Sequence, residues 1–222
     1  MDFVKARNAM VDGQVRTADV TDPRILGAML DLPRERFVQP DQAELAYSDL
    51  DLPLVGERGR TSPRCLLRPM NLAKLIQAAA IGAEDRVLDI GAASGYAAAV
   101  LARLAREVVA LEEDPALAAF AGKNLAGCKV LNASVVTGPL TEGWPPQAPY
   151  DVILLEGASE IAPRMLFAQL RDGGRLACIE GRGLSGKATI YRSDGGVVSG
   201  RPVFDAAAPL LPGFVQPPAF VF

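Results

Sequence analysis

The segment VLDIGAASGY, residues 87–96, contains the residue types that are best placed to bind a ligand. Asp89 stands two residues before Gly91, and Gly95 stands four residues after it, with only alanine and serine between the glycines. An apolar run that ends in such a turn is typical of a buried strand leading into a helix. The helix N-terminus offers unpaired N–H groups and the positive end of its dipole, and small residues let a ligand approach the backbone. We therefore expect the ligand-binding crevice of an open α/β sheet here.

The glycine spacing separates two classes of nucleoside cofactor. A dinucleotide fingerprint needs glycine at three places, GxGxxG, and here those places hold Gly91, Ala93 and Tyr96. A nicotinamide-dependent dehydrogenase is therefore disfavoured. Asp89, Gly91 and Gly95 instead fit a site for S-adenosylmethionine, whose free amino group can lie near an acid at the strand end and which has no pyrophosphate. The alternative is that the glycines only pack a strand against a helix.

A second acidic residue supports the same cofactor. The apolar run VVALE ends in Glu112, about 20 residues after Gly91, which is the spacing at which an acid accepts hydrogen bonds from ribose hydroxyls. Glu113 and Asp114 add negative charge that favours a free ribose over a 2′-phosphate. For these two residues, solvated surface acids at the start of the next helix are the alternative. Together, the two motifs predict a nucleoside cofactor.

The composition excludes several other kinds of site. The chain of 222 residues has no histidine, which removes histidine-based acid–base catalysis, the Ser-His-Asp triad and most zinc sites, and we expect no metal. The formal net charge of -3 provides no global basic field for nucleic acid or membrane. Three scattered cysteines fit reduced thiols, and the N-terminus lacks the apolar core of a signal peptide. We expect a cytoplasmic protein of unknown oligomeric state.

The periodicity of the chain predicts the elements that position these residues. Residues 1–68 form an N-terminal extension with a helix that starts at Thr21 or Asp22, followed by irregular loops. In residues 69–182, apolar strands alternate with helices, which predicts a Rossmann-like, doubly wound, mostly parallel sheet with helices on both faces. In residues 183–222, two apolar runs flank SDGG, which predicts an antiparallel hairpin that completes the sheet.

At this point the chain resembles the protein-L-isoaspartate O-methyltransferase family over nearly its whole length. Three segments are similar to the family's N-terminal segment, cofactor motif, and fourth and fifth strands: VTDPRILGAMLDLPRERFVQP with AYSDLDLPL, VLDIGAASGYAAAVLARLA, and APYDVILLEGASEIAPRMLFAQLRDGGRLACIEG. The resemblance implies methyl transfer from S-adenosylmethionine to the free carboxylate of an isoaspartyl residue, as in protein repair. The resulting ester closes to a succinimide, which can reopen to aspartate.

The motifs and the resemblance together define the expected cofactor contacts. The expected cofactor-binding residues are Asp89, Gly91, Ala92, Ala93, Ser94, Gly95, Tyr96, Glu112, Glu113, Gly138, Pro139 and Leu140. The last three follow the third strand, where the family usually has an aspartate that contacts the adenine amine; here Pro139 takes its place. Trp144 is expected to pack near the adenine end.

The candidate catalytic residues lie where the chain departs from the family. The family's substrate loop reads glycine-glutamine-threonine-isoleucine-serine, whereas this chain has GRTSPR, and the family serine that lies near the acceptor matches Ser62 best, with Thr61 beside it. Glu156 replaces a small polar residue after the fourth apolar run. The candidates for catalysis are therefore Ser62, Thr61 and Glu156. Arg60, Arg64 and Arg68 could clamp an acidic substrate or form a solvated basic face.

Because of Glu156, the sequence does not decide the chemical class of the methyl acceptor. A carboxylate acceptor is already an anion near neutral pH and needs no general base, and an acid beside it would repel it. A hydroxyl or amine acceptor would instead profit from Glu156 as a base. Glu156 could also contact the cofactor or cap a helix. The leading expectation is carboxyl methylation of isoaspartyl peptides or proteins. The alternatives are a methyltransferase with another peptide or small-molecule acceptor, and a cofactor-binding homologue without catalysis.

Overall fold

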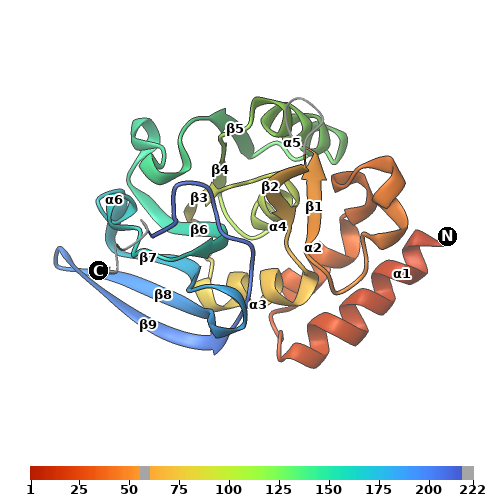
Figure 1. The fold of residues 1–222 in the computed structure, drawn as a ribbon, viewed down its shortest axis with the longest axis horizontal. Coiled ribbons are helices and arrows are strands. Elements are labelled where there is room, and N and C mark those ends of the chain that lie inside the picture. The colour runs from red at the N-terminus through yellow and green to blue at the C-terminus, as the bar shows by residue number, and fades with distance from the viewer. Residues whose placement is uncertain (56–60, 217–222) are drawn as a thin grey trace, which may run out of the picture.

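The computed structural model describes residues 1–55 and 61–216, and of residues 61–63 it describes the backbone only. A seven-stranded sheet in the order β5-β4-β3-β6-β7-β8-β9 forms the centre of the molecule (Figure 1). Its strands are β3 (Arg86–Ile90), β4 (Glu107–Glu112), β5 (Ala133–Thr137), β6 (Tyr150–Ser159), β7 (Leu170–Glu180), β8 (Lys187–Asp194) and β9 (Val197–Asp205). The pairs from β5 to β7 are parallel and the last two pairs are antiparallel, so the expected fold class is confirmed.

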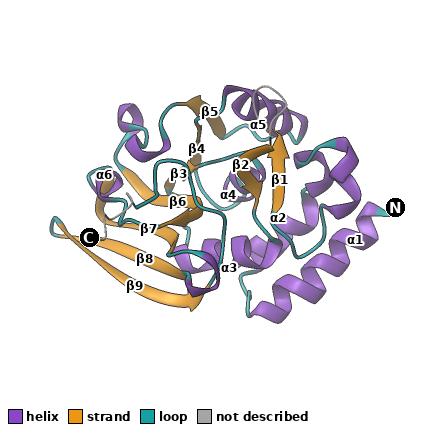
Figure 2. Ribbon diagram, viewed as in Figure 1, coloured by secondary structure: helices purple, strands orange, loops and turns teal. Residues whose placement is uncertain are grey.

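Helices and short turns cover the two faces of the sheet (Figure 2). The α-helices are α1 (Phe3–Met10), α2 (Pro23–Asp31), α3 (Pro69–Ala79), α4 (Tyr96–Leu101), α5 (Pro115–Gly127) and α6 (Arg164–Phe167). Asp22 begins α2 as an N-cap, because its carboxylate accepts a hydrogen bond from the N–H of Arg24. Asp114 caps α5 in the same way. Both α4 and α6 are shorter than their apolar runs predict. In the described chain, no helix is long and apolar enough to cross a membrane.

Alternate strand residues face opposite sides, as the twofold period of a strand requires. Val87, Val108 and Val152 belong to a large cluster that also contains the apolar sides of α2, α3 and α4. Leu88, Val109 and their neighbours on the other face pack against a second cluster, which includes Leu140 of a short helical turn, Leu166 of α6 and Phe214. The N-terminal extension therefore shares one continuous core with the α/β sheet.

A two-stranded hairpin replaces part of the irregular region expected before α3. β1 (Leu52–Val55) pairs antiparallel with β2 (Thr61–Leu66), with Pro53 opposite Cys65. Leu54 of β1 packs against Ala93 and Leu117, so the hairpin lies over the glycine-rich turn. Burial of Leu54 and the pairing of the two strands explain why this segment is ordered despite its many turn-forming residues.

The C-terminal segment after β9 also returns to the carboxyl ends of the parallel strands (Figure 1). Ala158 of β6 donates its N–H to the carbonyl of Pro209 and accepts a bond from the N–H of Leu211. These bonds place the side chain of Leu211 against Gly157 and Gly91. The tail thus packs against the turn at which the sequence predicts the crevice.

Candidate functional site: a crevice at the carboxyl ends of β3, β4 and β6

The glycine-rich turn follows β3 directly and begins α4. Gly91 has φ +80° and Gly95 has φ +87°, both in the left-handed region where a side chain is strained. A Cβ on Gly95 would lie 3.1 Å from the Cβ of Ala121 in α5, so this glycine also permits close packing of α4 against α5. A Cβ on Gly91 would instead point at the side chains of Arg64 and Leu211. The packing alternative thus describes Gly95, whereas the space beside Gly91 is filled by the side chains of Arg64 and Leu211.

Glu112 reaches the same turn from the end of β4, because Ile90 and Leu111 are paired in the parallel sheet. Its Oε2 accepts a bond of 2.7 Å from the N–H of Ala93. Its Oε1 accepts bonds from the N–H groups of Glu113 at 2.9 Å and Asp114 at 3.1 Å. These backbone donors fix a fully buried carboxylate beside Gly91. The two motifs found in the sequence therefore meet at one site.

Arg64 of β2 extends into this site. Its Nε donates to Glu112 Oε2 at 3.1 Å, and its Nη2 donates to the carbonyl oxygen of Gly91. Its side chain is only 2% exposed. The expectation that Arg64 belongs to a solvated basic face is therefore wrong. Arg68, in contrast, forms an ion pair with Asp51, with 3.1 Å between Nη2 and Oδ2, and does not pair with Glu112. Arg60 lies outside the described residues.

Asp89 and Glu156 form a buried pair of carboxyl groups below the turn. Burial and the negative charge of Asp89 raise the pKa of Glu156 well above its usual range, and burial likewise raises the pKa of Asp89. A proton on Glu156 can be donated to Asp89. Apart from that proton, neither oxygen of Asp89 has a hydrogen-bond donor among the residues that the structure describes. Since α6 begins only at Arg164, Glu156 is not a helix cap.

This pair predicts a pH-dependent stability. The folded chain holds a proton on Glu156 at pH values where the unfolded glutamate has lost it, so the free energy of unfolding falls as pH rises from about 5 through the raised pKa. Glu156→Gln should therefore be more stable than the wild type by about 1–3 kcal/mol at pH 8. At pH 5 the gain should be smaller.

Urea unfolding at pH 5 and pH 8 measures this effect. Glu142→Gln, at an exposed side chain, is the matched control and should leave stability unchanged at both pH values. Equal effects of Glu156→Gln at both pH values would contradict the buried carboxyl pair.

The loop after β5 forms the far end of the crevice. Gly138 donates its N–H to the carbonyl of Glu112 at 3.2 Å, and a Cβ on Gly138 would lie 3.4 Å from the ring of Trp144. Leu140 is buried in the second cluster. Trp144 thus lies beside the loop at which the adenine is expected. Contacts from Gly138, Pro139 and Leu140 to an adenine stay predictions.

The remaining candidate site residues are Tyr96, which lies in the core, and Thr61 and Ser62, of which only the backbone is described. The fully buried ring of Tyr96 packs edge-on against Phe37, with their centroids 5.3 Å apart, and under the guanidinium of Arg34, so its role as a cofactor contact stays a prediction. The backbone of Thr61 and Ser62 belongs to β2, but their side chains lie outside the described residues. Their catalytic roles also stay predictions.

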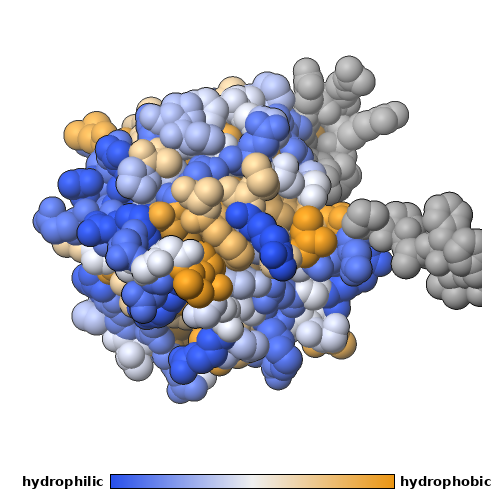
Figure 3. Space-filling view, turned by 90° about the vertical axis from the view of Figure 1, so that its left-hand side faces the viewer, coloured by the Kyte–Doolittle hydropathy of each residue, from blue (hydrophilic) through white to orange (hydrophobic). Residues whose placement is uncertain are grey.

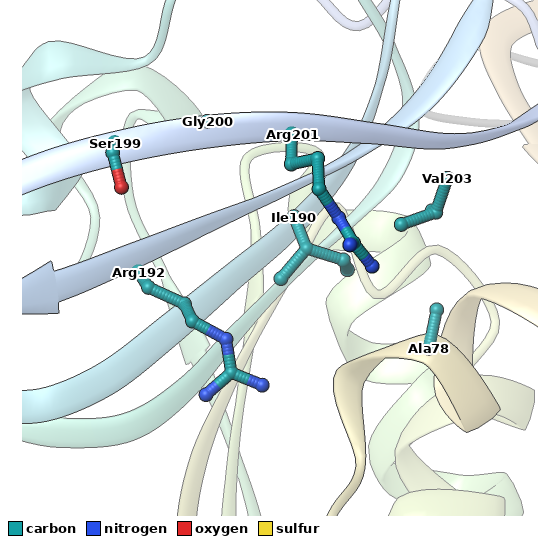
Figure 4. A pocket seen from close by; sticks show the side chains of 7 residues that line it. All are labelled: Ala78, Ile190, Arg192, Ser199, Gly200, Arg201 and Val203. Atoms are coloured by element: carbon teal, nitrogen blue, oxygen red, sulfur yellow. The ribbon is translucent and has the colours of Figure 1, made fainter.

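A separate cavity of about 550 Å³ lies between the end of α3 and the hairpin of β8 and β9 (Figure 4). It is lined by Ala78, Ile190, Arg192, Ser199, Gly200, Arg201 and Val203. In the pairing of the two strands, Arg192 of β8 lies opposite Arg175 in the middle of β7, and β8 is three strands away from β3, so this cavity is distinct from the crevice. Seen from the left-hand side of Figure 1, apolar residues extend from the middle of the molecule toward the right, and hydrophilic residues predominate on the left (Figure 3).

The comparisons with known proteins agree with this geometry. The family model described as Protein-L-isoaspartate(D-aspartate) O-methyltransferase (PCMT) matches residues 5–199. The chain belongs to this family. A protein-L-isoaspartate O-methyltransferase of Methanoculleus marisnigri is 42% identical over 172 residues, which are 78% of this chain and 76% of that protein. The homologue of the same name from Methanoregula boonei is 40% identical over 187 residues, 84% of this chain and 83% of that protein.

Two solved structures of PCMT proteins have the same fold. A protein-L-isoaspartate O-methyltransferase superposes with a TM-score of 0.78 at 26% identity, over 89% of this chain and 63% of that chain. A Plasmodium falciparum protein described as a β-aspartate methyltransferase, in complex with S-adenosyl-L-homocysteine, superposes with a TM-score of 0.73 at 16% identity, over 91% of this chain and 96% of that chain. The PCMT fold thus covers the extension as well as the sheet.

Three residues that lie at this site could not be recognised from the sequence as neighbours of the cofactor. Leu54 and Leu211 wall the crevice from segments that lie far from the glycine motif, and nothing in their local pattern marks them. Arg64 stood out only as one of three nearby arginines. Its burial against Glu112 depends on the pairing of β1 with β2, a contact that local spacing does not encode.

Proposed function

We propose that this chain transfers the methyl group of S-adenosylmethionine to the free carboxylate of an isoaspartyl residue in a peptide or protein. The observation that carries the proposal is the family match over residues 5–199, which spans both the N-terminal extension and the acid-lined crevice. The residues of the crevice fit the cofactor. Asp89 has two buried oxygens that could accept bonds from an amino group, and Glu112 ends the neighbouring strand, where an acid that binds ribose hydroxyls is expected.

The chain's own residues have to bind, orient and exclude water. S-adenosylmethionine, when bound, supplies a methyl group on a cationic sulfur. An isoaspartyl carboxylate is already ionised near neutral pH, so the protein need not remove a proton from it. Gly91 leaves room beside the backbone, and Leu54 and Leu211 provide apolar walls that keep water from the reacting groups. A chain without histidine can carry out this chemistry.

Glu156 supports a second candidate function, methyl transfer to an amine or hydroxyl. Its carboxyl group is buried next to Asp89, and burial raises its pKa, so once its proton has left it is a stronger base than an exposed glutamate and can remove a proton from a neutral acceptor. For a carboxylate acceptor the same side chain would be repulsive whenever it is ionised. The two candidates therefore make opposite demands on Glu156.

A tritiated-methyl transfer assay on matched isoaspartyl and aspartyl peptides tests the proposal. We expect incorporation with the isoaspartyl peptide and background with the aspartyl peptide, and we expect Glu156→Thr to keep that activity because a carboxylate acceptor needs no base. If the wild type and Glu156→Thr both bind S-adenosylmethionine and label neither peptide, the isoaspartyl function is wrong. The changed acceptor, or a cofactor-binding homologue without catalysis, would then take its place.

A further inference from the structure

The geometry points to Arg64 as an internal occupant of the cofactor crevice that S-adenosylmethionine must displace in order to bind. We call this arrangement of Arg64 on Glu112 and Gly91 the arginine latch. The inference rests on the cofactor named in the proposed function, but it concerns how the crevice is opened. Cofactor affinity then depends on a competition for Glu112 between the guanidinium of Arg64 and the ribose of the cofactor.

The first observation is that Glu112 already accepts a full set of hydrogen bonds. Oε1 takes two backbone N–H donors and Oε2 takes the N–H of Ala93 together with Nε of Arg64. The backbone donors are fixed by the turns after β3 and β4. Arg64 is therefore the donor that ribose hydroxyls can replace. Because the side chain is flexible while the turns are not, exchange at Oε2 requires Arg64 to leave.

The second observation is that Arg64 fills the space that the small residues of the turn leave open. A Cβ on Gly91 would lie 2.2 Å from Nη2 of Arg64 and 2.9 Å from its Cζ. The guanidinium thus lies directly against the backbone where a nucleoside would have to approach. With Arg64 at 2% exposure and Glu112 at 0%, the ion pair excludes solvent as well as ligand.

The third observation concerns charge. Asp89, Glu112 and Glu156 bring three buried carboxyl groups to the crevice, and the positive charge of Arg64 lowers the pKa of Asp89 and of Glu156 against the opposing effect of burial. S-adenosylmethionine brings a cationic sulfur and an amino group to the same carboxyl groups. Two cationic ligands in one buried site repel each other, so the guanidinium and the cofactor exclude each other. Each one brings positive charge to these acids when the other is absent.

The latch lowers the apparent affinity for cofactor, because only the fraction of molecules with Arg64 withdrawn can bind. Arg64→Ala should therefore bind S-adenosylhomocysteine roughly tenfold more tightly than the wild type. Calorimetry measures the affinity, and the fluorescence of Trp144, the single tryptophan, provides a second readout beside the loop after β5. Arg68→Ala is the matched control, since Arg68 pairs with Asp51 and not with Glu112, and its affinity should equal that of the wild type.

Unchanged or weaker binding by Arg64→Ala would overturn the latch, because Arg64 would then be a spectator or a ligand of the cofactor's own carboxylate. If Arg64→Ala does not fold, Arg64→Lys replaces it. Lysine keeps the charge but not the two-pronged contact to Glu112 and Gly91, so tighter binding is again expected, by a smaller factor. Binding that is not tightened in this variant would equally overturn the latch.

A chemical test uses the wild type alone. Phenylglyoxal modifies accessible guanidinium groups, and mass spectrometry locates the modified residue. We expect Arg64 to be protected in the free protein and modified in the presence of S-adenosylhomocysteine; protection in both states would overturn the latch.

Both tests measure the state of the cofactor site and not methyl transfer, so failure of the latch and failure of the proposed function can be told apart. If Arg64→Ala binds more tightly while no isoaspartyl peptide is labelled, the proposed function fails and the latch stands. If the isoaspartyl peptide is labelled and Arg64→Ala binds with unchanged affinity, the latch fails and the proposed function stands.

Discussion

Glu112→Ala is expected to weaken binding of S-adenosylmethionine and S-adenosylhomocysteine by about 1–3 kcal/mol, because the carboxylate that would accept the ribose hydroxyls is lost. The same change removes the partner of a buried guanidinium. Since Arg64 would be left with an uncompensated charge in a site that is 2% exposed, the free energy of unfolding should fall by about 3–5 kcal/mol. Calorimetry measures the first effect and urea unfolding the second.

Glu107→Ala is the matched control for this variant. Glu107 begins the same strand, β4, at the opposite end of the sheet, and its pair with Arg86 is about one-third exposed, at 36% and 32%. Loss of such a partly exposed pair should cost no more than about 1 kcal/mol and should leave cofactor affinity unchanged. An affinity that Glu112→Ala leaves unaltered in a chain that also carries Arg64→Ala, where the latch is absent, would contradict the ribose assignment.

Gly91→Val is expected to abolish cofactor binding. The backbone at φ +80° disfavours any branched side chain, and the new atoms would occupy the space between the turn, Arg64 and Leu211. We expect a loss of at least about 100-fold in affinity for S-adenosylhomocysteine, corresponding to roughly 2.7 kcal/mol, and a destabilisation of about 1–2 kcal/mol from the left-handed conformation.

Gly122→Ala provides the comparison, because Gly122 lies in α5 with open space at its Cβ position, and this variant should bind as the wild type does. Calorimetry with S-adenosylhomocysteine and NADH separates the two cofactor classes. Tight binding of NADH by the wild type, without binding of S-adenosylhomocysteine, would contradict the assignment of the crevice.

The sheet and the cofactor motif could be predicted because their signals are local. Each buried parallel strand, such as residues 86–90, is a short apolar run, and the alternation of such runs with helices specifies the topology. The hairpin of β8 and β9 was equally predictable from two apolar runs around a turn, and the structure confirms it. Asp89, Gly91 and Glu112 come together because parallel strands end at one edge of the sheet.

The contents of the crevice could not be predicted because they depend on contacts between distant segments. β1 and β2 are rich in turn-forming residues, and only burial of Leu54 against Ala93 and Leu117 makes them strands. That pairing, in turn, directs Arg64 toward Glu112, which lies 48 residues further along the chain. The raised pKa of Glu156 is also a consequence of burial beside Asp89, and a sequence pattern does not contain that information.

The chemical nature of the transferred methyl group tests the central claim, a carboxylate acceptor, most directly. After incubation of the wild type with an isoaspartyl peptide and S-adenosylmethionine that carries a tritiated methyl group, the labelled peptide is treated with mild base. A carboxyl methyl ester releases its label as volatile methanol, whereas a methyl group on an amine or an ether oxygen stays on the peptide. We predict release of the label with the isoaspartyl peptide and no labelling of its aspartyl counterpart; a label that survives base would contradict the account.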